Sequence, residues 1–277
     1  MHQNGSRIAI MAAPKVTSPA MPITIEACVA RHTGDRKEQQ DRVGLFAHPT
    51  RPGTMLAVLA DGMGGHSGGA MAAEQVVLKA KQNFDGFSPR NESPEHLLEG
   101  IVSEAHLVIK LTRFTSEKDP HTTAVVLMLQ PDRVNWIHCG DSRLYHFRSA
   151  QLVSRSQDHS LVAELQRKGT LDEAGALTHP QRNVLVSCLG SERSPRTALG
   201  VSAPLVMGDS FLLCSDGLWA HFSDAELGAA IAAVPAREAA QNLIRHARER
   251  AGGCGDNISL AIVKLVEAPA RNGSTAQ

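Results

Sequence analysis

The stretch Met55-Leu56-Ala57-Val58-Leu59-Ala60-Asp61-Gly62-Met63-Gly64-Gly65-His66 joins an apolar run to an acid, a glycine-rich turn and a histidine. Six consecutive apolar residues predict a buried strand. A carboxylate at the end of such a strand can hold a divalent cation, and the following glycine leaves its carbonyl open to the same ion. A plain strand-to-helix connection would carry the same residues, so this stretch alone leaves both interpretations open.

Three further acids share this setting, because each lies beside a small residue and next to an apolar run. Asp141 follows the run 134–139, Asp216 follows the run 210–215, and Asp256 precedes a run that extends through residue 266. A single acid at a strand end usually caps a turn or a helix. Four of them predict one shared site rich in oxygen ligands, which Mg²⁺ and Mn²⁺ prefer. The sequence has no Cys-x-x-Cys or His-Glu-x-x-His pattern that would indicate zinc.

Eight motifs, taken in order, resemble those of the metal-dependent serine/threonine protein phosphatases, the type 2C-like family in its bacterial form. They are residues 36–41, residues 61–66, Thr122-Thr123, Gly140-Asp141-Ser142-Arg143, Asp158-His159-Ser160, residues 179–183, Ser215-Asp216-Gly217 and Gly255-Asp256-Asn257. The match runs from about residue 23 to residue 266. The resemblance implies an α+β fold: an antiparallel β-sandwich flanked by helix pairs on both faces, in α-β-β-α layers.

The resemblance also implies a centre of two Mn²⁺ or Mg²⁺ ions at one end of the sandwich. In that centre Asp61 bridges the two ions and the Gly62 carbonyl binds one of them. Asp216 and Asp256 complete the ligand set. The resemblance implies hydrolysis of phosphoserine and phosphothreonine by attack of a metal-bridging hydroxide, so that no protein nucleophile is needed.

Further roles follow from the same resemblance. Asp41 would hold a metal-bound water, and Asp141 with Asp216 would form a weaker third metal site. Arg36 would bind the substrate phosphate, because its planar guanidinium can donate two parallel hydrogen bonds to phosphate oxygens. His66 would protonate the leaving alcohol, since the ordinary pKa of histidine lies close to neutrality.

Arg36 also has a simpler interpretation, a surface salt bridge to Glu38 or Asp35. Residues 158–183 resemble the family's flap, a segment beside the active site that influences substrate choice. Within it, His179 and Arg182 are the predicted substrate contacts. The predicted partners are phosphorylated proteins, namely a bacterial serine/threonine kinase and its substrates.

Two positions depart from the family pattern. Gln39-Gln40 stands where the family usually has Asn-Glu, and His121 stands where a glycine usually precedes Thr-Thr. Gln40 can hydrogen-bond a metal-bound water but brings no negative charge. We therefore expect weaker cation affinity or a shifted pH optimum than a glutamate at this position would give.

Composition predicts one domain of residues 23–267, between flexible tails at 1–22 and 268–277. The chain has 277 residues, of which 42% are hydrophobic, and 28 basic residues balance 28 acidic ones. Without a basic block or a span of about 20 apolar residues, we expect neither nucleic-acid nor membrane partners. Five scattered cysteines are typical of reduced core residues in a cytoplasmic protein. The absence of a coiled-coil pattern favours a monomer.

Helices and strands alternate between the motifs. Apolar spacing predicts helices at 67–84, 94–114, 224–233 and 235–250, and strands at 122–129, 134–138 and 144–147. Two other functions stay open: a different two-metal hydrolase such as a phosphodiesterase, and a non-catalytic regulatory module on the same fold. The module is disfavoured, because clustered acids repel one another and serve no purpose without a cation.

Overall fold

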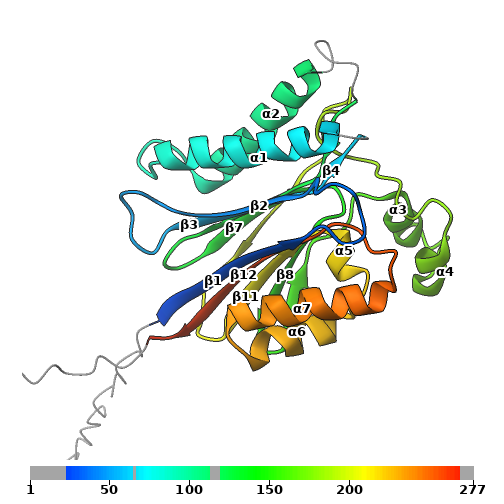
Figure 1. Cartoon of the computed structure of the whole chain (residues 1–277). Helices are drawn as coiled ribbons and strands as arrows, with labels where there is room; N and C mark the ends of the chain where they lie inside the picture. Colours follow the sequence, from blue (N-terminus) through cyan, green and yellow to red (C-terminus); the bar gives the residue numbers. More distant parts are fainter. Residues whose placement is uncertain (1–22, 65–66, 113–118, 269–277) are drawn as a thin grey trace, which may run out of the picture.

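The computed structural model describes residues 23–64, 67–112 and 119–268 (Figure 1). The tails expected at 1–22 and 268–277 lie outside these residues, apart from residue 268. Within them, no helix is both long and apolar enough to cross a membrane.

Two five-stranded antiparallel sheets form the centre of the molecule. The first has the order β1 (Ile23–His32), β12 (Ile258–Glu267), β11 (Asp209–Cys214), β8 (Arg143–Arg148) and β9 (Gln151–Arg155). The second has the order β10 (Ala198–Ser202), β7 (Val134–Cys139), β6 (Ala124–Leu129), β3 (Met55–Ala60) and β2 (Arg42–Ala47). The predicted β-sandwich is thereby confirmed.

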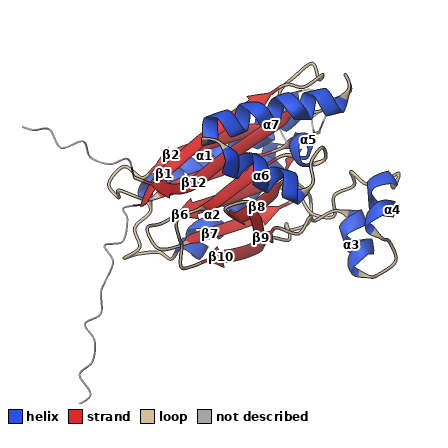
Figure 2. Ribbon diagram, turned by 90° about the horizontal axis from the view of Figure 1, so that it is seen from below, coloured by secondary structure: helices blue, strands red, loops and turns tan. Residues whose placement is uncertain are grey.

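Helix pairs cover both outer faces. α1 (Ser67–Gly86) and α2 (Pro94–Thr112) lie on the second sheet, and α6 (Asp224–Ala233) and α7 (Ala236–Ala251) lie on the first (Figures 1 and 2). The Ser223 and Glu226 side chains form a capping box that starts α6. α7 ends at Gly252, whose φ of 61° is the left-handed conformation that favours glycine there. All four helices agree closely with the predicted ranges.

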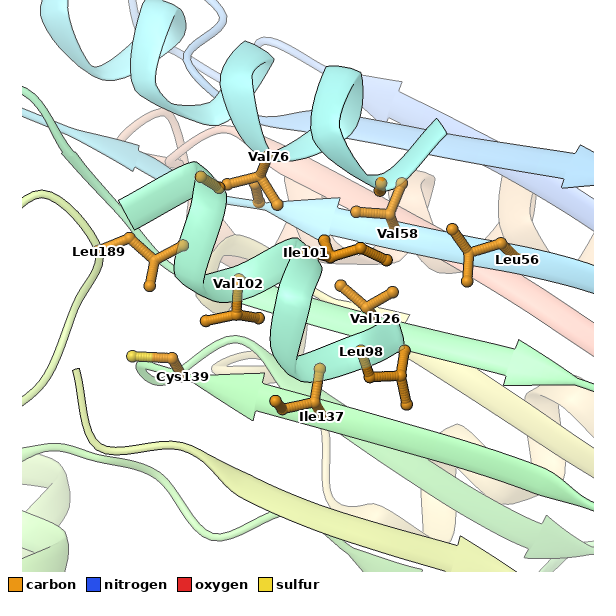
Figure 3. Close-up of a cluster of buried hydrophobic side chains, with 14 of the residues drawn as sticks. Leu56, Val58, Val76, Leu98, Ile101, Val102, Val126, Ile137, Cys139 and Leu189 are labelled. Carbon is orange, nitrogen blue, oxygen red and sulfur yellow. The ribbon is translucent and has the colours of Figure 1, made fainter. Parts of the chain in front are cut away.

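β3 explains why the central strands are apolar throughout. Leu56 and Val58 face the helices α1 and α2, whereas Ala57 and Leu59 face the other sheet. Figure 3 shows the helix-facing layer. A strand covered on both faces needs no polar residues, and each fully buried Leu or Val contributes roughly 1.5–3 kcal/mol. The resulting rigid layers hold the strand ends in place.

The predicted strand 122–129 is interrupted at Thr123, so that part of the prediction was wrong. Its amide donates to the Asp61 carbonyl at 2.9 Å, and its hydroxyl accepts from the Asp61 amide at 2.9 Å. These bonds divert the backbone, so β5 (His121–Thr122) pairs with β4 (Gly62–Met63) in a separate small sheet. The interruption therefore fixes the end of β3 that carries Asp61.

The flap contains two short helices that the sequence did not indicate, α3 (Leu161–Arg167) and α4 (Glu173–Thr178). Ser160 caps α3 and Asp172 caps α4. α3 has only seven residues, so its apolar Leu161, Val162 and Leu165 are too short a pattern to mark a helix in the sequence. Both helices stand away from the sandwich in Figure 2.

The cysteines are only partly core residues. All five are free, and Cys139 and Cys214 are buried as expected. Cys254 is exposed, because it lies in the glycine-rich turn between α7 and β12. The core assignment was wrong for that residue.

Candidate active site

The four acids meet at one end of the sandwich because of strand direction. β3 and β7 both pair antiparallel with β6, so the ends that carry Asp61 and Asp141 lie at the same edge. β11 and β12 are antiparallel, which brings Asp216, after β11, next to Asp256, before β12. A cavity of about 520 Å³ opens there. Its described lining is Arg36, Lys37, Glu38, Gln40, Asp61, Gly62, Met63, Gly64, Asp141, Asn183, Leu185, Asp216, Asp256 and Asn257.

Burial and mutual repulsion disfavour ionisation of these acids. Burial first, and then the charges of Asp41, Asp216, Asp141 and Asp256, raise the pKa of Asp61 well above its usual value. Burial and the neighbouring Asp141, Asp256 and Asp41 raise the pKa of Asp216 to about 8. Such a cluster is stabilised in its ionised form only by positive charge close by.

Asp41 lies beneath this cavity, with 1% of its surface exposed. One carboxylate oxygen, Oδ2, accepts a hydrogen bond from the Ser215 hydroxyl at 2.9 Å. The other, Oδ1, is buried and has no hydrogen-bond partner among the described residues, although the Ser259 and Asp61 side chains lie close enough to counter the effect of burial on the pKa of Asp41. Burial raises the pKa of Asp41 to about 6, against the hydrogen bond from Ser215. A buried carboxylate oxygen without a partner is costly unless a ligand satisfies it.

These donors fit hard divalent cations. Beside the cationic Arg36 and Lys37, the cavity lining offers carboxylate, amide and backbone oxygens, with no Cys or His among its described residues. Within the described part of the chain, no three His, Cys, Asp or Glu side chains lie close enough together to hold one metal ion. Asp256 is instead engaged by a cation of the protein itself, because its Oδ2 accepts from Arg36 Nη2 at 2.6 Å.

Arg36 therefore has neither of the salt-bridge partners considered from the sequence. Its partner is Asp256, and the two side chains are 62% and 40% exposed. Asp35 instead accepts a hydrogen bond from the Gly255 amide at 2.7 Å. Arg36 lines the cavity, so its guanidinium lies where a phosphate above the acids can reach it.

Asn257 fastens segment 33–41, which carries Arg36, to the strand that carries Asp256. Its side-chain amide donates to the Thr33 carbonyl at 2.8 Å and to the Glu38 carbonyl at 3.0 Å, and its Oδ1 accepts from the Gln40 amide at 2.7 Å. This positioning role was missed from the sequence, where the only signal was the place of Asn257 beside Asp256.

A close backbone contact at Gly34 also holds segment 33–41. Gly34 has a φ of 66°, and a Cβ built on it would lie 2.0 Å from the Asp256 carbonyl oxygen. Only glycine permits this approach. Segment 33–41 therefore packs directly against the backbone of Asp256, which lines the cavity.

Three predicted site residues remain to be placed: His179, Arg182 and His66. His179 is the C-cap residue of α4, where its Nδ1 accepts from the Gln181 amide at 3.1 Å. His179 and Arg182 do not line the cavity; Asn183, the last residue of the flap, and Leu185, just after it, do so instead. His66 lies outside the described residues. The structure brings together the predicted acids and Arg36, and leaves the flap contacts as predictions.

Comparisons with known proteins agree with this geometry. A family model described as protein phosphatase 2C matches residues 30–252. Protein phosphatase PhpP of Streptococcus pneumoniae is 32% identical over 235 residues, which cover 84% of this chain and 94% of the relative.

Two solved structures are similar over most of the chain. The serine/threonine phosphatase of S. agalactiae has a TM-score of 0.78 and 31% identity, covering 88% of this chain and 100% of that one. The catalytic domain of serine/threonine protein phosphatase PstP, in complex with 2 manganese ions, has a TM-score of 0.75 and 25% identity, with coverage of 88% and 100%. The chain therefore belongs to the protein phosphatase 2C family.

Proposed function

We propose that the protein hydrolyses phosphoserine and phosphothreonine in other proteins, with two Mn²⁺ or Mg²⁺ ions held by the acids of the cavity. One observation carries the proposal: buried acids from separate strand ends converge on one cavity and raise one another's pKa values. The named activity of the relatives and the two manganese ions in the PstP complex support it.

The ligands proposed for the two ions are Asp61, Gly62, Asp216 and Asp256. Bound there, two cations can supply hydroxide near neutral pH and neutralise the phosphoryl oxygens of a monoester. Asp41 would then satisfy its unpartnered oxygen through a water. A weaker third ion would take Asp141 together with Asp216.

The arrangement allows the Arg36 guanidinium to exchange one partner for another. In the structure its guanidinium contacts Asp256. A phosphate dianion can accept two parallel hydrogen bonds from the planar Arg36 guanidinium. Such a two-point interaction is stronger than a single hydrogen bond. We infer that Arg36 turns to the substrate phosphate, which releases Asp256 to serve as a ligand.

The substrate side of the proposal concerns His66 and the flap. His66 would give a proton to the leaving serine or threonine oxygen. His179 and Arg182 would contact the protein around the phosphorylated residue. The proposed partners are a bacterial serine/threonine kinase and its substrates, and no described feature of the chain distinguishes among such kinases.

The test is hydrolysis of para-nitrophenyl phosphate and of a phosphothreonine peptide with Mn²⁺, with chelator, and by Asp216→Asn. We expect turnover with Mn²⁺ that is lost in chelator and in the variant. A folded wild type that binds Mn²⁺ but turns over neither substrate would contradict catalysis and support a regulatory module. Turnover of phosphodiesters but not of the phosphopeptide would support the other two-metal hydrolase.

A further inference from the structure

Arg143 holds the base of the flap through a forked ion pair. Its Nε and Nη2 donate to the two oxygens of Asp158 at 2.9 and 2.8 Å. The two side chains are only 15% and 12% exposed, so water screens the pair poorly. Asp158 is the first residue of the flap, and it therefore has one strong, directional attachment to β8.

The same guanidinium lies on a tryptophan that contacts an acid of the cavity. Arg143 Cζ is 3.5 Å from the ring centroid of Trp219, a stacked cation–π arrangement. The Trp219 indole Nε1 donates to the Asp141 carbonyl at 3.0 Å. Trp219 ends α5 (Asp216–Trp219), whose first residue is Asp216. One side chain thus joins the flap to the elements that carry Asp141 and Asp216.

Other contacts at the flap base are backbone hydrogen bonds next to this pair. The His159 amide donates to the Gly140 carbonyl at 2.8 Å, and the Val186 amide donates to the His159 carbonyl at 2.9 Å. Beyond this base, α3 has no fully buried side chain, and Glu164 ties it to Arg196 through a partly exposed ion pair at 2.8 Å. A segment with little buried surface owes its placement to the few contacts at its ends.

We propose that Arg143 is a positioning residue that links flap order to cation occupancy beside Asp141. A cation that fixes Asp141 and Asp216 also fixes Trp219, and through Arg143 it steadies Asp158 and the flap. Linkage is reciprocal, so a substrate that orders the flap also strengthens cation binding. The inference rests on the proposed function for both its cation and its substrate.

The test uses Arg143→Lys, which keeps the positive charge but loses the fork and the stacked plane. Arg155→Lys is the matched control, because Arg155 also contacts both oxygens of an acid, Asp224, at 3.0 Å, outside the flap. Amide hydrogen exchange of residues 161–168 is measured with and without Mn²⁺, and thermal unfolding confirms that each variant folds. Trp219→Phe, which keeps the ring but removes the N–H donor, gives a second route if Arg143→Lys does not fold.

We expect Mn²⁺ to slow flap exchange in the wild type and in Arg155→Lys by about tenfold, an effect that Arg143→Lys and Trp219→Phe lose in large part. Arg143→Lys should also raise KM for a phosphothreonine peptide about fivefold, with kcat for para-nitrophenyl phosphate nearly unchanged. Flap exchange that responds equally to Mn²⁺ in wild type and in the folded variants would overturn the linkage. If no protein hydrolyses either substrate, the proposed function fails, while the exchange experiment still decides the linkage.

Discussion

Two segments border the acidic cavity, and they are fastened to the sandwich by different forces. Segment 33–41 is held by neutral hydrogen bonds to Asn257 and by the close backbone approach at Gly34. The flap is held at its base by the charged pair of Arg143 and Asp158. The backbone that carries Arg36 is therefore placed mainly by shape and neutral hydrogen bonds, and the ion pair of Arg36 with Asp256 is well exposed. The flap base depends on a largely buried charged pair and can respond to ions.

The sharpest test of this contrast compares two glycines with the same backbone conformation. Gly34 and Gly169 have φ values of 66° and 70°, but a Cβ on Gly169, in the flap, meets nothing within 4 Å. Gly169→Ala should cost only the left-handed conformation, about 1–2 kcal/mol. Gly34→Ala must also displace the Asp256 backbone, so it should lower kcat/KM for an aryl phosphate by at least about tenfold. Denaturant unfolding and steady-state kinetics measure both, and equal effects would contradict the comparison.

Asn257→Asp tests the clamp, meaning the neutral hydrogen bonds by which Asn257 holds segment 33–41. The change replaces two donors with an acceptor that faces the carbonyls of Thr33 and Glu38, so segment 33–41 should loosen. We expect a loss of about 1–2 kcal/mol in unfolding free energy, since two part-buried carbonyls lose their donors. Asn242→Asp on α7 is the control, because Asn242 only accepts a bond, from Arg245. Unchanged stability of Asn257→Asp relative to this control would show that the clamp is not needed.

His159 gives the flap a pH dependence opposite in sign to that of segment 33–41, where the raised pKa of Asp41, about 6, removes stability as the pH rises. Burial first, and then the charges of His138 and Arg196, lower the pKa of His159 from 6.5 to about 4, although Asp158 opposes this. Between these pH values the opened flap base binds more protons than the closed one. The stability of the closed base is therefore complete above pH 6.5 and declines as the pH falls towards 4.

Hydrogen exchange of residues 161–168, corrected for the intrinsic pH dependence of exchange, measures this opening. We expect faster opening in acid for the wild type and a much flatter profile for His159→Gln. Exchange of residues 33–41 is measured alongside, where Asp41 should give the opposite slope. A flap profile with the same slope as that of residues 33–41 would remove the predicted difference between the two segments.

Gln40→Glu should give the smallest effect, because it changes charge without disturbing the clamp. The Gln40 backbone amide, not its side chain, donates to Asn257. The added carboxylate on the cavity wall should tighten Mn²⁺ binding by about two- to tenfold and move the pH profile of hydrolysis. Equal Mn²⁺ affinities and pH profiles in the two proteins would show that position 40 does not influence the cations.

The sandwich was implied by the family resemblance, whereas its strands and acids could be predicted from the residues for a physical reason. Strands covered on both faces are apolar throughout, as β3 is, and an acid directly after such a run is conspicuous. The direction of the strands then requires these acids to meet at one edge. The types of the elements and the positions of the acids therefore follow from local sequence patterns.

Other features depend on contacts distant in sequence. The role of Asn257 appears only when segment 33–41 folds over β12, and the Asp256 partner of Arg36 is 220 residues away. α3 has only seven residues, so no periodic pattern reveals it. The interruption at Thr123 follows from hydrogen bonds to Asp61, which a run of strand-forming residues does not disclose.

Calorimetric titration of Mn²⁺ tests the proposed cation centre most directly. It compares wild type, Asp61→Asn and Asp132→Asn, an exposed acid paired with Arg133 that serves as the control. We predict that wild type and the control bind two ions, with affinity that rises with pH as the acids lose their protons. Asp61→Asn should lose most of this binding. No Mn²⁺ binding by folded wild type, or equal binding by Asp61→Asn, would contradict the conclusion that these acids form a cation centre.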